Sequence, residues 1–293
     1  EEQKFGVAAK EKLTQLAVNV DTLTLTATPI PRTLQFSLMG SRDLSVISTP
    51  PPNRQPIVTE SHVFSEEIIR DAVETELARG GQVYFVHNRV EDLMTMQGLI
   101  TRICPKARVG VGHGKMPAEK LERLIMEFIY GEFDVLVATT IVENGIDIPN
   151  ANTIIVNNAQ NFGLSDLHQL RGRVGRGSVS GTCLVMTHSK GNGGASAAQD
   201  RLQSLEKTSD GFTLAQMDLR LRHEGEILGY RQHGGVTLRF VDLDADEDLI
   251  EWAHLDAVEL LRYACTLDSV ATRPLRDAVA MRYRHIFKEV SGG

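Results

Sequence analysis

Three arginines lie close together in residues 169–176, which read Gln-Leu-Arg-Gly-Arg-Val-Gly-Arg. Guanidinium groups presented from a helix with glycine kinks suit bidentate, charge-assisted hydrogen bonds to phosphate oxygens. In an NTPase, such an arginine neutralises the charge that develops during phosphoryl transfer. The alternative is a basic helix face that only meets solvent. The pattern therefore indicates a phosphate-directed site or a solvated helix.

A second polar segment, residues 139–149, follows an apolar stretch and reads Thr-Thr-Ile-Val-Glu-Asn-Gly-Ile-Asp-Ile-Pro. The hydroxyl and N–H groups of Thr139 and Thr140 at a strand end suit a DNA phosphate, which carries no sequence information. The alternative is a pair of threonines that caps a turn. Asp147 either lies near a nucleotide or caps a turn. The position of this segment after a strand favours a site shared with the arginines.

The segment around His113 has two glycine neighbours, which allow the backbone to approach a sugar–phosphate closely. The alternative is a loop histidine without a ligand. Gly114 and Lys115 come nearest to a phosphate loop, G-x-x-x-x-G-K-[ST]. However, Val109 replaces the first glycine of that pattern and Met116 replaces its Ser/Thr. We therefore expect this chain by itself to turn over no ATP.

Composition limits the classes of protein that this chain can represent. It has 293 residues, of which 42% are apolar, and a net charge of −7, which argues against a general nucleic-acid coat but allows a local basic groove. The three cysteines, Cys104, Cys183 and Cys265, are too dispersed for a disulfide framework or a metal site. They predict a reducing, cytoplasmic location. No apolar run reaches transmembrane length, and the scattered histidines predict no metal site.

Helices and strands are expected to alternate in the middle of the chain. This alternation predicts an α/β fold, with a parallel sheet and helices on both faces. Sites in such sheets lie outside the carboxyl ends of the strands, so we expect all the segments above at that edge. The expected helices are 65–79, 90–103, 116–130 and 164–173, and the expected strands are 82–87, 108–111, 134–138, 153–156 and 182–187.

The two ends of the chain differ in character from the middle. A strand is expected at 23–27, and three consecutive prolines within 49–56 predict a linker and a domain boundary. Residues 189–198 are expected to be a loop, 198–207 and 212–222 a pair of helices, and 241–261 an acidic helix. A basic patch between Arg273 and Lys288 is either a solvated helix face or a DNA contact.

These segments together resemble the motifs of superfamily 2 helicases. Residues 1–3 resemble the end of the D-E-x-H/Q motif, 26–28 motif III, 82–87 motif IV, 139–149 motif V and 169–176 motif VI. With 26–33 and 112–116, they are most similar to the branch that holds the transcription-repair coupling factor Mfd and the replication-fork helicase RecG, which are double-stranded DNA translocases. Residues 1–175 look more like Mfd and 178–261 more like RecG, as a divergent homologue or a hybrid would.

The resemblance implies roles for single residues. Glu1 falls at the water-activating carboxylate, although the preceding Asp that holds Mg²⁺ is absent, and Arg173 and Arg176 resemble arginine fingers. Gly145, Asp147 and Gln169 are implied to lie near the nucleotide. Asn144 and His223 depart from the family pattern, so the fine coupling is left open. DNA contact or coupling is implied for Thr26, Thr28, His113, Gly114, Thr139, Arg201, Arg222 and Gln232.

The resemblance also implies a RecA-like fold with four parts. These are the remnant of a first motor lobe (1–50), a second motor lobe (51–190), a translocation motif formed by a helical hairpin and loop (191–235), and a C-terminal helical segment (236–293). The implied function is that of an ATP-dependent double-stranded DNA translocase in DNA repair, with ATP and Mg²⁺ as cofactors. RNA polymerase is a further implied partner, through domains outside this chain. The alternatives are a non-catalytic nucleic-acid or protein binding module and, against the translocation motif, an RNA helicase.

Overall fold

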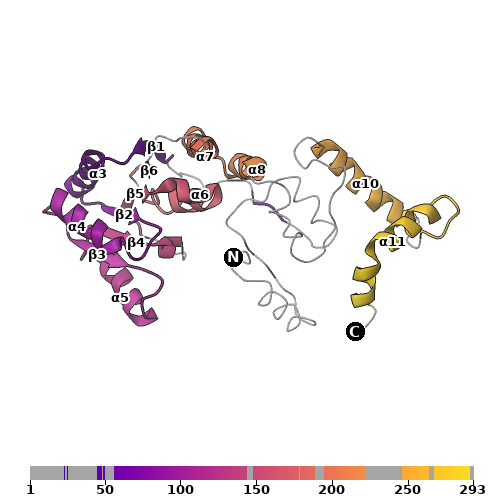
Figure 1. Ribbon diagram of the computed structural model, residues 1–293, viewed down its shortest axis with the longest axis horizontal. Coiled ribbons are helices and arrows are strands. Elements are labelled where there is room, and N and C mark those ends of the chain that lie inside the picture. Colours follow the sequence, from indigo (N-terminus) through magenta and orange to yellow (C-terminus); the bar gives the residue numbers. More distant parts are fainter. Residues whose placement is uncertain are drawn as a thin grey trace. The chain divides into compact units, whose positions relative to one another are not determined.

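The computed structural model describes residues 23, 25, 45–47, 49, 56–143, 148–177, 179–188, 195–221, 246–263 and 267–290. Contacts divide the chain into two compact units. One unit contains the described residues between 56 and 221, and the other contains those between 246 and 290 (Figure 1). The expected strand at 23–27 and the expected linker at 49–56 lie almost wholly outside the described residues.

The first unit is built on a six-stranded sheet in the order β1-β6-β5-β2-β4-β3, in which every pairing is parallel. It confirms the expected α/β class. Helices connect the strands, as parallel pairing requires. The strands are β1 (Val58–Val63), β2 (Gln82–Val86), β3 (Val109–Gly112), β4 (Val135–Ala138), β5 (Ala151–Asn157) and β6 (Thr182–Thr187).

Helices cover both faces of the sheet. The faces alternate along each strand: Tyr84 and Val86 of β2 belong to one apolar cluster, and Val83 and Phe85 belong to the other. The first cluster contains buried residues of α5 (Ala118–Ile129), α6 (Leu164–Arg171), α7 (Ala195–Lys207) and α8 (Gly211–Leu221). The second contains those of α3 (Glu66–Ala78) and α4 (Leu93–Ile103).

Most elements agree with the expectations, and the differences have physical reasons. The N-cap of α3 is Ser65, whose hydroxyl accepts a hydrogen bond from the Ile68 N–H at 3.4 Å. Helix α4 begins at Leu93, three residues after the expected start at Val90. Strand β1 was not expected, because its sequence Val-Thr-Glu-Ser-His-Val is mostly polar. It is an edge strand that pairs only with β6, so it needs no continuous apolar run.

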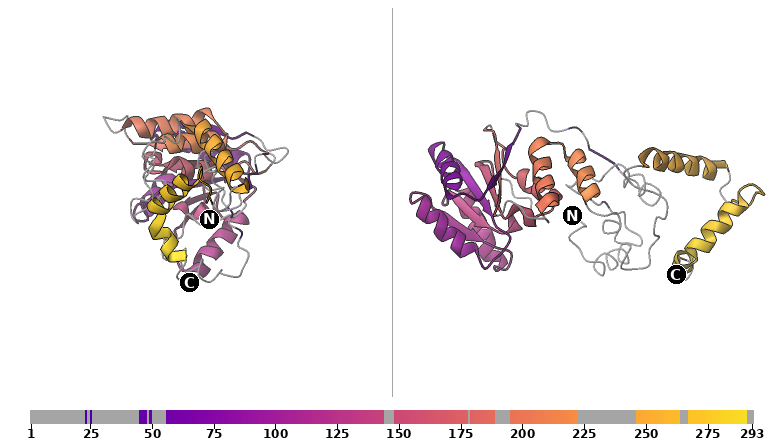
Figure 2. Two further views of the ribbon diagram at one scale, coloured as in Figure 1. Left: turned by 90° about the vertical axis from the view of Figure 1, so that its right-hand side faces the viewer. Right: turned by 45° about the horizontal axis from the view of Figure 1, so that its top comes forward.

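Helices α7 and α8 form a hairpin that shares the core of the sheet (Figure 2). The expected loop up to Ala198 was too long, because α7 begins at Ala195. Asp210 begins α8: its carboxylate accepts hydrogen bonds from the Thr213 hydroxyl and from the N–H groups of Thr213 and Phe212. The Thr213 hydrogen bond is the main reason why the pKa of Asp210 lies below its ordinary value.

The second unit contains α10 (Glu247–Tyr263) and α11 (Arg273–Val290). Helix α10 corresponds to the described part of the expected acidic helix at 241–261, whose residues 241–245 lie outside the described residues. In α11, Arg276 forms ion pairs with Asp268 and Asp277, so the basic patch is partly neutralised. Among the described residues, no helix is long and apolar enough to cross a membrane.

The buried cysteine Cys183 provides a first testable prediction. Complete burial raises the pKa of its thiol to about 12, and the nearby charge of Arg171 only partly opposes this shift. At pH 8, only roughly one molecule in 10⁴ would then carry the reactive thiolate. We expect iodoacetamide to label Cys183 at least about 10³-fold more slowly than a free cysteine. Peptide mass spectrometry after timed labelling would measure this rate, and equal labelling with and without urea would contradict the burial.

Candidate functional site

The arginine segment is held in place by α6 and by the loop that follows it. Helix α6 buries its leucines at positions 164, 167 and 170, whose spacing keeps them on one face. After the helix ends at Gly172, Val174 returns to the core with 1% of its surface exposed. Gly175 has a φ of +68°, which favours glycine, and a Cβ there would lie 3.1 Å from the Cα of Gly181. This close packing fixes the loop that carries Arg173 and Arg176.

The arginine loop lies at the amino edge of the sheet. Gly181 directly precedes β6, and its carbonyl accepts a hydrogen bond from the Val58 N–H at the start of β1. A Cβ at Gly177 would lie 3.0 Å from the carbonyl oxygen of Pro149, which precedes β5. The expectation that all motifs gather at the carboxyl edge is therefore wrong for this segment. The physical reason is that α6 runs back from the carboxyl end of β5 to the amino end of β6.

The side chains of this loop differ in exposure. Arg173 is half-buried, whereas Arg176 is exposed and its Nε donates a hydrogen bond of 3.1 Å to the Gly172 carbonyl. Gln169 is half-buried one turn earlier in α6. Pro149 is the last residue of the second polar segment. It lies close to Gly177, which directly follows the arginine segment. The end of the second polar segment thus lies at the amino edge, whereas its start at Thr139 lies at the carboxyl edge.

A second polar group lies at the opposite edge, where β3 and β4 end. The Thr139 N–H donates a hydrogen bond of 3.3 Å to the Gly112 carbonyl, which places Thr139 beside His113 and Gly114. The His113 N–H contacts the Met116 sulfur at 3.4 Å, and the Met116 N–H donates to the His113 carbonyl at 3.0 Å. Gly114 is exposed at the tip. Thr139 and His113 are half-buried, so Gly114 is the part of these loops that is open to a phosphate backbone.

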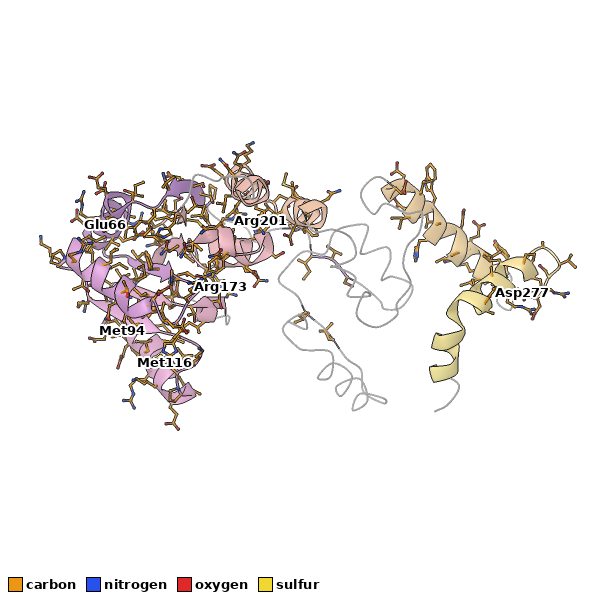
Figure 3. The ribbon with its side chains drawn as sticks, in the orientation of Figure 1. Glu66, Met94, Met116, Arg173, Arg201 and Asp277 are labelled. Carbon is orange, nitrogen blue, oxygen red and sulfur yellow. The ribbon has the colours of Figure 1, made fainter. Side chains whose placement is uncertain are left out.

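Arg201 lies near the same carboxyl edge. Its Nη2 donates a hydrogen bond of 3.3 Å to the carbonyl of Gln160, in the short 3₁₀ helix η3 (Ala159–Asn161) that follows β5. Figure 3 shows Arg201, on α7, apart from Arg173. Among the described residues, the structure therefore separates His113, Gly114, Thr139 and Arg201 from the expected arginine fingers.

The sequence interpretation missed a polar network at the carboxyl edge. Asn157, which is 1% exposed, donates to His87 Nδ1 at 3.2 Å and accepts from His188 Nε2 at 3.0 Å. His87 Nε2 in turn lies 3.3 Å from the Asp92 carboxylate, and the His188 ring stacks on Phe64. These contacts connect the carboxyl ends of β2, β5 and β6. A polar residue directly after each apolar strand was the available signal.

Several expected site residues cannot be placed. Glu1, Thr26, Thr28, Gly145, Asp147, Arg222 and Gln232 lie outside the described residues. Within the residues that the structure describes, no group of three or more His, Cys, Asp or Glu residues could hold a metal ion.

Comparison with known proteins identifies the domain. The model of the helicase conserved C-terminal domain matches residues 65–178. Residues 65–178 of the chain are therefore a helicase conserved C-terminal domain. The match contains β2 to β5, the Thr139 edge and the arginine loop, so both parts of the site lie within the domain.

The chain is similar to transcription-repair-coupling factors and to RecG. Over 246 residues, which are 83% of the chain, it is 50% identical to the transcription-repair-coupling factor of Bacillus subtilis (strain 168). It is 47% identical to that of Staphylococcus haemolyticus over the same length. A solved structure of RecG bound to a three-way DNA junction is 36% identical, with a TM-score of 0.63, over 80% of this chain and 31% of that chain. The match to the coupling factors extends past residue 175, so this likeness is not confined to the first part of the chain.

The chain spans about a fifth of the length of the coupling factors that it matches. The activity and partners of a whole protein are therefore treated below as proposals.

Proposed function

We propose that this chain is the C-terminal motor portion of an ATP-dependent double-stranded DNA translocase that acts in DNA repair, by transcription-repair coupling or replication-fork rescue. The observation that carries the proposal is the placement of two phosphate-directed groups on opposite edges of one sheet. The arginine loop lies at the amino edge, the Thr139 and His113 loops lie at the carboxyl edge, and α6 runs between them. A helicase lobe must contact nucleotide and DNA at separate places, and this arrangement supplies both.

At the amino edge, Arg173 and Arg176 would reach the γ-phosphate of ATP that is bound mainly by another lobe. The exposed guanidinium of Arg176 and the rigid loop around Gly175 support this role. Gln169 would contact the nucleotide from α6, with Gly145 and Asp147 nearby. Glu1 would activate the attacking water. Mg²⁺ would be held by residues outside this chain, and it would neutralise phosphate charge during hydrolysis.

At the carboxyl edge, His113, Gly114 and Thr139 would hold the DNA backbone. The exposure of Gly114 at the tip of its loop, with Thr139 beside it, supports a contact without base reading. The remaining proposed DNA-contact or coupling residues are Thr26, Thr28, Arg201, Arg222 and Gln232. Such a grip should weaken as salt rises, because binding releases counterions from the DNA.

The proposed parts of the chain are those expected from the resemblance: residues 1–50 end a first motor lobe, 51–190 form the second lobe, 191–235 form the translocation motif and 236–293 form a C-terminal helical segment. The partners would be double-stranded DNA and, for a coupling role, RNA polymerase bound by domains outside the chain. A cytoplasmic location agrees with this DNA substrate and with the free thiols of Cys104 and Cys183.

The test uses a two-lobed protein that contains this segment and a phosphate-loop lobe. Duplex DNA should stimulate its ATP turnover, and it should displace the third strand of a triplex. We expect Thr139→Ala to raise the DNA concentration for half-maximal stimulation by about tenfold, the loss of one hydrogen bond to a charged phosphate. The turnover rate at saturating DNA should remain.

The matched control is Thr101→Ala, an exposed threonine near the end of α4, which runs from the carboxyl end of β2 to the amino end of β3 and so places Thr101 toward the edge opposite Thr139. It should leave both quantities unchanged. DNA binding without any stimulation of ATP turnover would instead support a non-catalytic binding module. Stronger stimulation by RNA than by duplex DNA would support an RNA helicase.

A further inference from the structure

The residues at the carboxyl ends of the six strands form one row across the sheet. In the order of the strands from β1 to β3, they are Phe64, His188, Asn157, His87, Thr139 and His113. Adjacent strands lie about 4.8 Å apart, so His188 at the end of β6 lies roughly 14 Å from Thr139 at the end of β4. The DNA contacts proposed at Thr139 and His113 therefore occupy only one end of the row.

The amide of Asn157 fixes the hydrogen-bonding roles of the two histidines beside it. Its Oδ1 accepts a hydrogen bond of 2.9 Å from the Asn158 N–H, which can only donate. The amide therefore points Oδ1 toward His188 Nε2, at 3.0 Å, and Nδ2 toward His87 Nδ1, at 3.2 Å. His188 Nε2 must then carry a proton, whereas His87 Nδ1 must accept.

These roles leave the two histidines with different capacities to gain a second proton. His87 is 2% exposed, and its Nε2 lies 3.3 Å from the Asp92 carboxylate. A proton on its Nδ1 would meet the Nδ2 donor of Asn157. His188 is exposed, and its Nδ1 has no hydrogen-bond partner in the described part of the chain. Protonation of His188 keeps the Asn157 bond and adds an N–H donor with a positive charge.

The His188 ring is held in one orientation. Its face stacks on Phe64, with ring centroids 4.5 Å apart, while its Nε2 bonds Asn157. A second cation lies at the neighbouring strand end, because Arg201 bonds the Gln160 carbonyl just after β5. A fixed donor beside another cation suits a phosphate group, since little side-chain freedom is lost on binding.

No ion pair neutralises His188 within the described residues. The charged groups of the adjoining segments are Glu60 and His62 of β1, Glu66 and Glu67 of α3, Asp92 before α4 and Arg201 of α7. Glu60 pairs with His62, and Glu66 pairs with Arg102. The side chains that contact the His188 ring, Phe64 and Asn157, are uncharged. A positive charge on His188 therefore stays available to a ligand.

We propose that His188 is a further contact for the DNA phosphate backbone and that it binds more tightly when it is protonated. The inference rests on the proposed function, in which DNA lies at the carboxyl edge. Its distance from Thr139 corresponds to roughly four phosphates of one strand, at about 3.4 Å along the duplex axis for each. Histidine ordinarily changes charge between pH 5 and 8, so DNA affinity should rise as the pH falls through this range. His87, which is held as an acceptor, contributes nothing to this change.

The experiment measures the binding of fluorescent duplex DNA to the two-lobed protein at pH 6 and pH 8, over a series of salt concentrations. At pH 6, His188→Gln should weaken binding by about fivefold, because a charge-assisted hydrogen bond is lost. The slope of log affinity against log salt should fall in magnitude by about 0.9, the value of one phosphate contact. At pH 8, variant and wild type should agree within about a factor of two, since neutral His188 has no free N–H for a phosphate.

Two further variants test the role of the charge. His188→Arg carries a permanent charge, so at pH 8 it should bind at least as tightly as the wild type at pH 6. The matched control is His62→Gln, which removes a half-buried histidine of β1 whose Nε2 lies 2.8 Å from the Glu60 carboxylate. It should keep the wild-type dependence of DNA affinity on pH.

The remaining outcomes separate the two proposals. An unchanged affinity of His188→Gln at pH 6, or an equal loss at both pH values, would overturn the His188 contact. An unchanged salt slope at pH 6 would overturn it as well, because the lost affinity would then have a structural cause. If the wild type binds no duplex DNA at either pH, the proposed function itself fails.

Discussion

Replacement of Arg176 by alanine in the two-lobed protein should lower ATP turnover by about 10³-fold or more, the magnitude typical of an arginine finger. The guanidinium is exposed at the amino edge, and its bond to the Gly172 carbonyl keeps it near the end of α6. DNA binding should remain within about a factor of two, because the proposed DNA contacts lie at the opposite edge. Steady-state ATP hydrolysis and a DNA-binding titration on one preparation measure both quantities.

Three variants sharpen this test. Arg173→Ala should show a similar loss, and Arg176→Lys should recover little, since lysine lacks the planar fork. Arg70→Ala removes an exposed arginine from α3, on the other face of the sheet, and should leave turnover unchanged. Weaker DNA binding with intact turnover in Arg176→Ala would reverse the assignment and place the arginine on DNA.

The buried strands could be predicted from the sequence because each contains a short apolar run. All five residues of β2 and all four of β4 are buried, so their composition reports their position in the sheet. Strand β1 could not be found in this way. Only one face of an edge strand needs to be apolar, and Thr59, Glu60 and Ser61 obscure the pattern. Strand β1 forms because it pairs with β6, and this contact between segments far apart in the sequence cannot be read from local sequence patterns.

The sequence offered candidate residues for the site but not their geometry. The arginine motif and the Thr139 segment were both recognised, yet they were expected at one edge. Their separation depends on the direction in which α6 runs across the sheet. Arg171 was treated as one of three phosphate-directed arginines, and its burial against α7 reassigns it to the hairpin. Residue type alone could not separate these roles, since all three arginines lie in one short segment.

Helix α6 connects the two edges of the sheet. It begins beside η3, whose Gln160 accepts the Arg201 hydrogen bond, and it ends at the arginine loop. A helix of eight residues is about 12 Å long, at about 1.5 Å per residue. Ser165 near its start bonds Asp218 of α8, and Arg171 at its end bonds the carbonyls of Leu205 and Thr208, so α6 is fixed to the hairpin at both ends. We therefore expect a substitution that disturbs the packing of the arginine loop to lower the free energy of unfolding of the first unit.

Among the residues of the arginine loop, we expect substitution of Gly175 to lower the stability of the first unit most. Gly175→Ala should lower the free energy of unfolding of the first unit by about 2–5 kcal/mol. Part of this cost is the left-handed backbone, since a φ of +68° costs an alanine about 1–2 kcal/mol. The rest is overpacking of about 1–3 kcal/mol, because the new Cβ would meet backbone atoms of Gly181 at 3.1 Å, which no rotamer change relieves.

Gly131→Ala separates the two contributions to the Gly175→Ala effect. Gly131 has a φ of +76° but nothing within 4 Å of an added Cβ, so it reports backbone strain alone, about 1–2 kcal/mol. Hydrogen exchange of β5 and β6 amides in rising urea would measure the stability of the first unit in each variant. Equal losses in the two variants would show that the Gly175–Gly181 approach contributes nothing. A larger loss at Gly175 would show that close backbone packing holds the arginine loop against the amino edge.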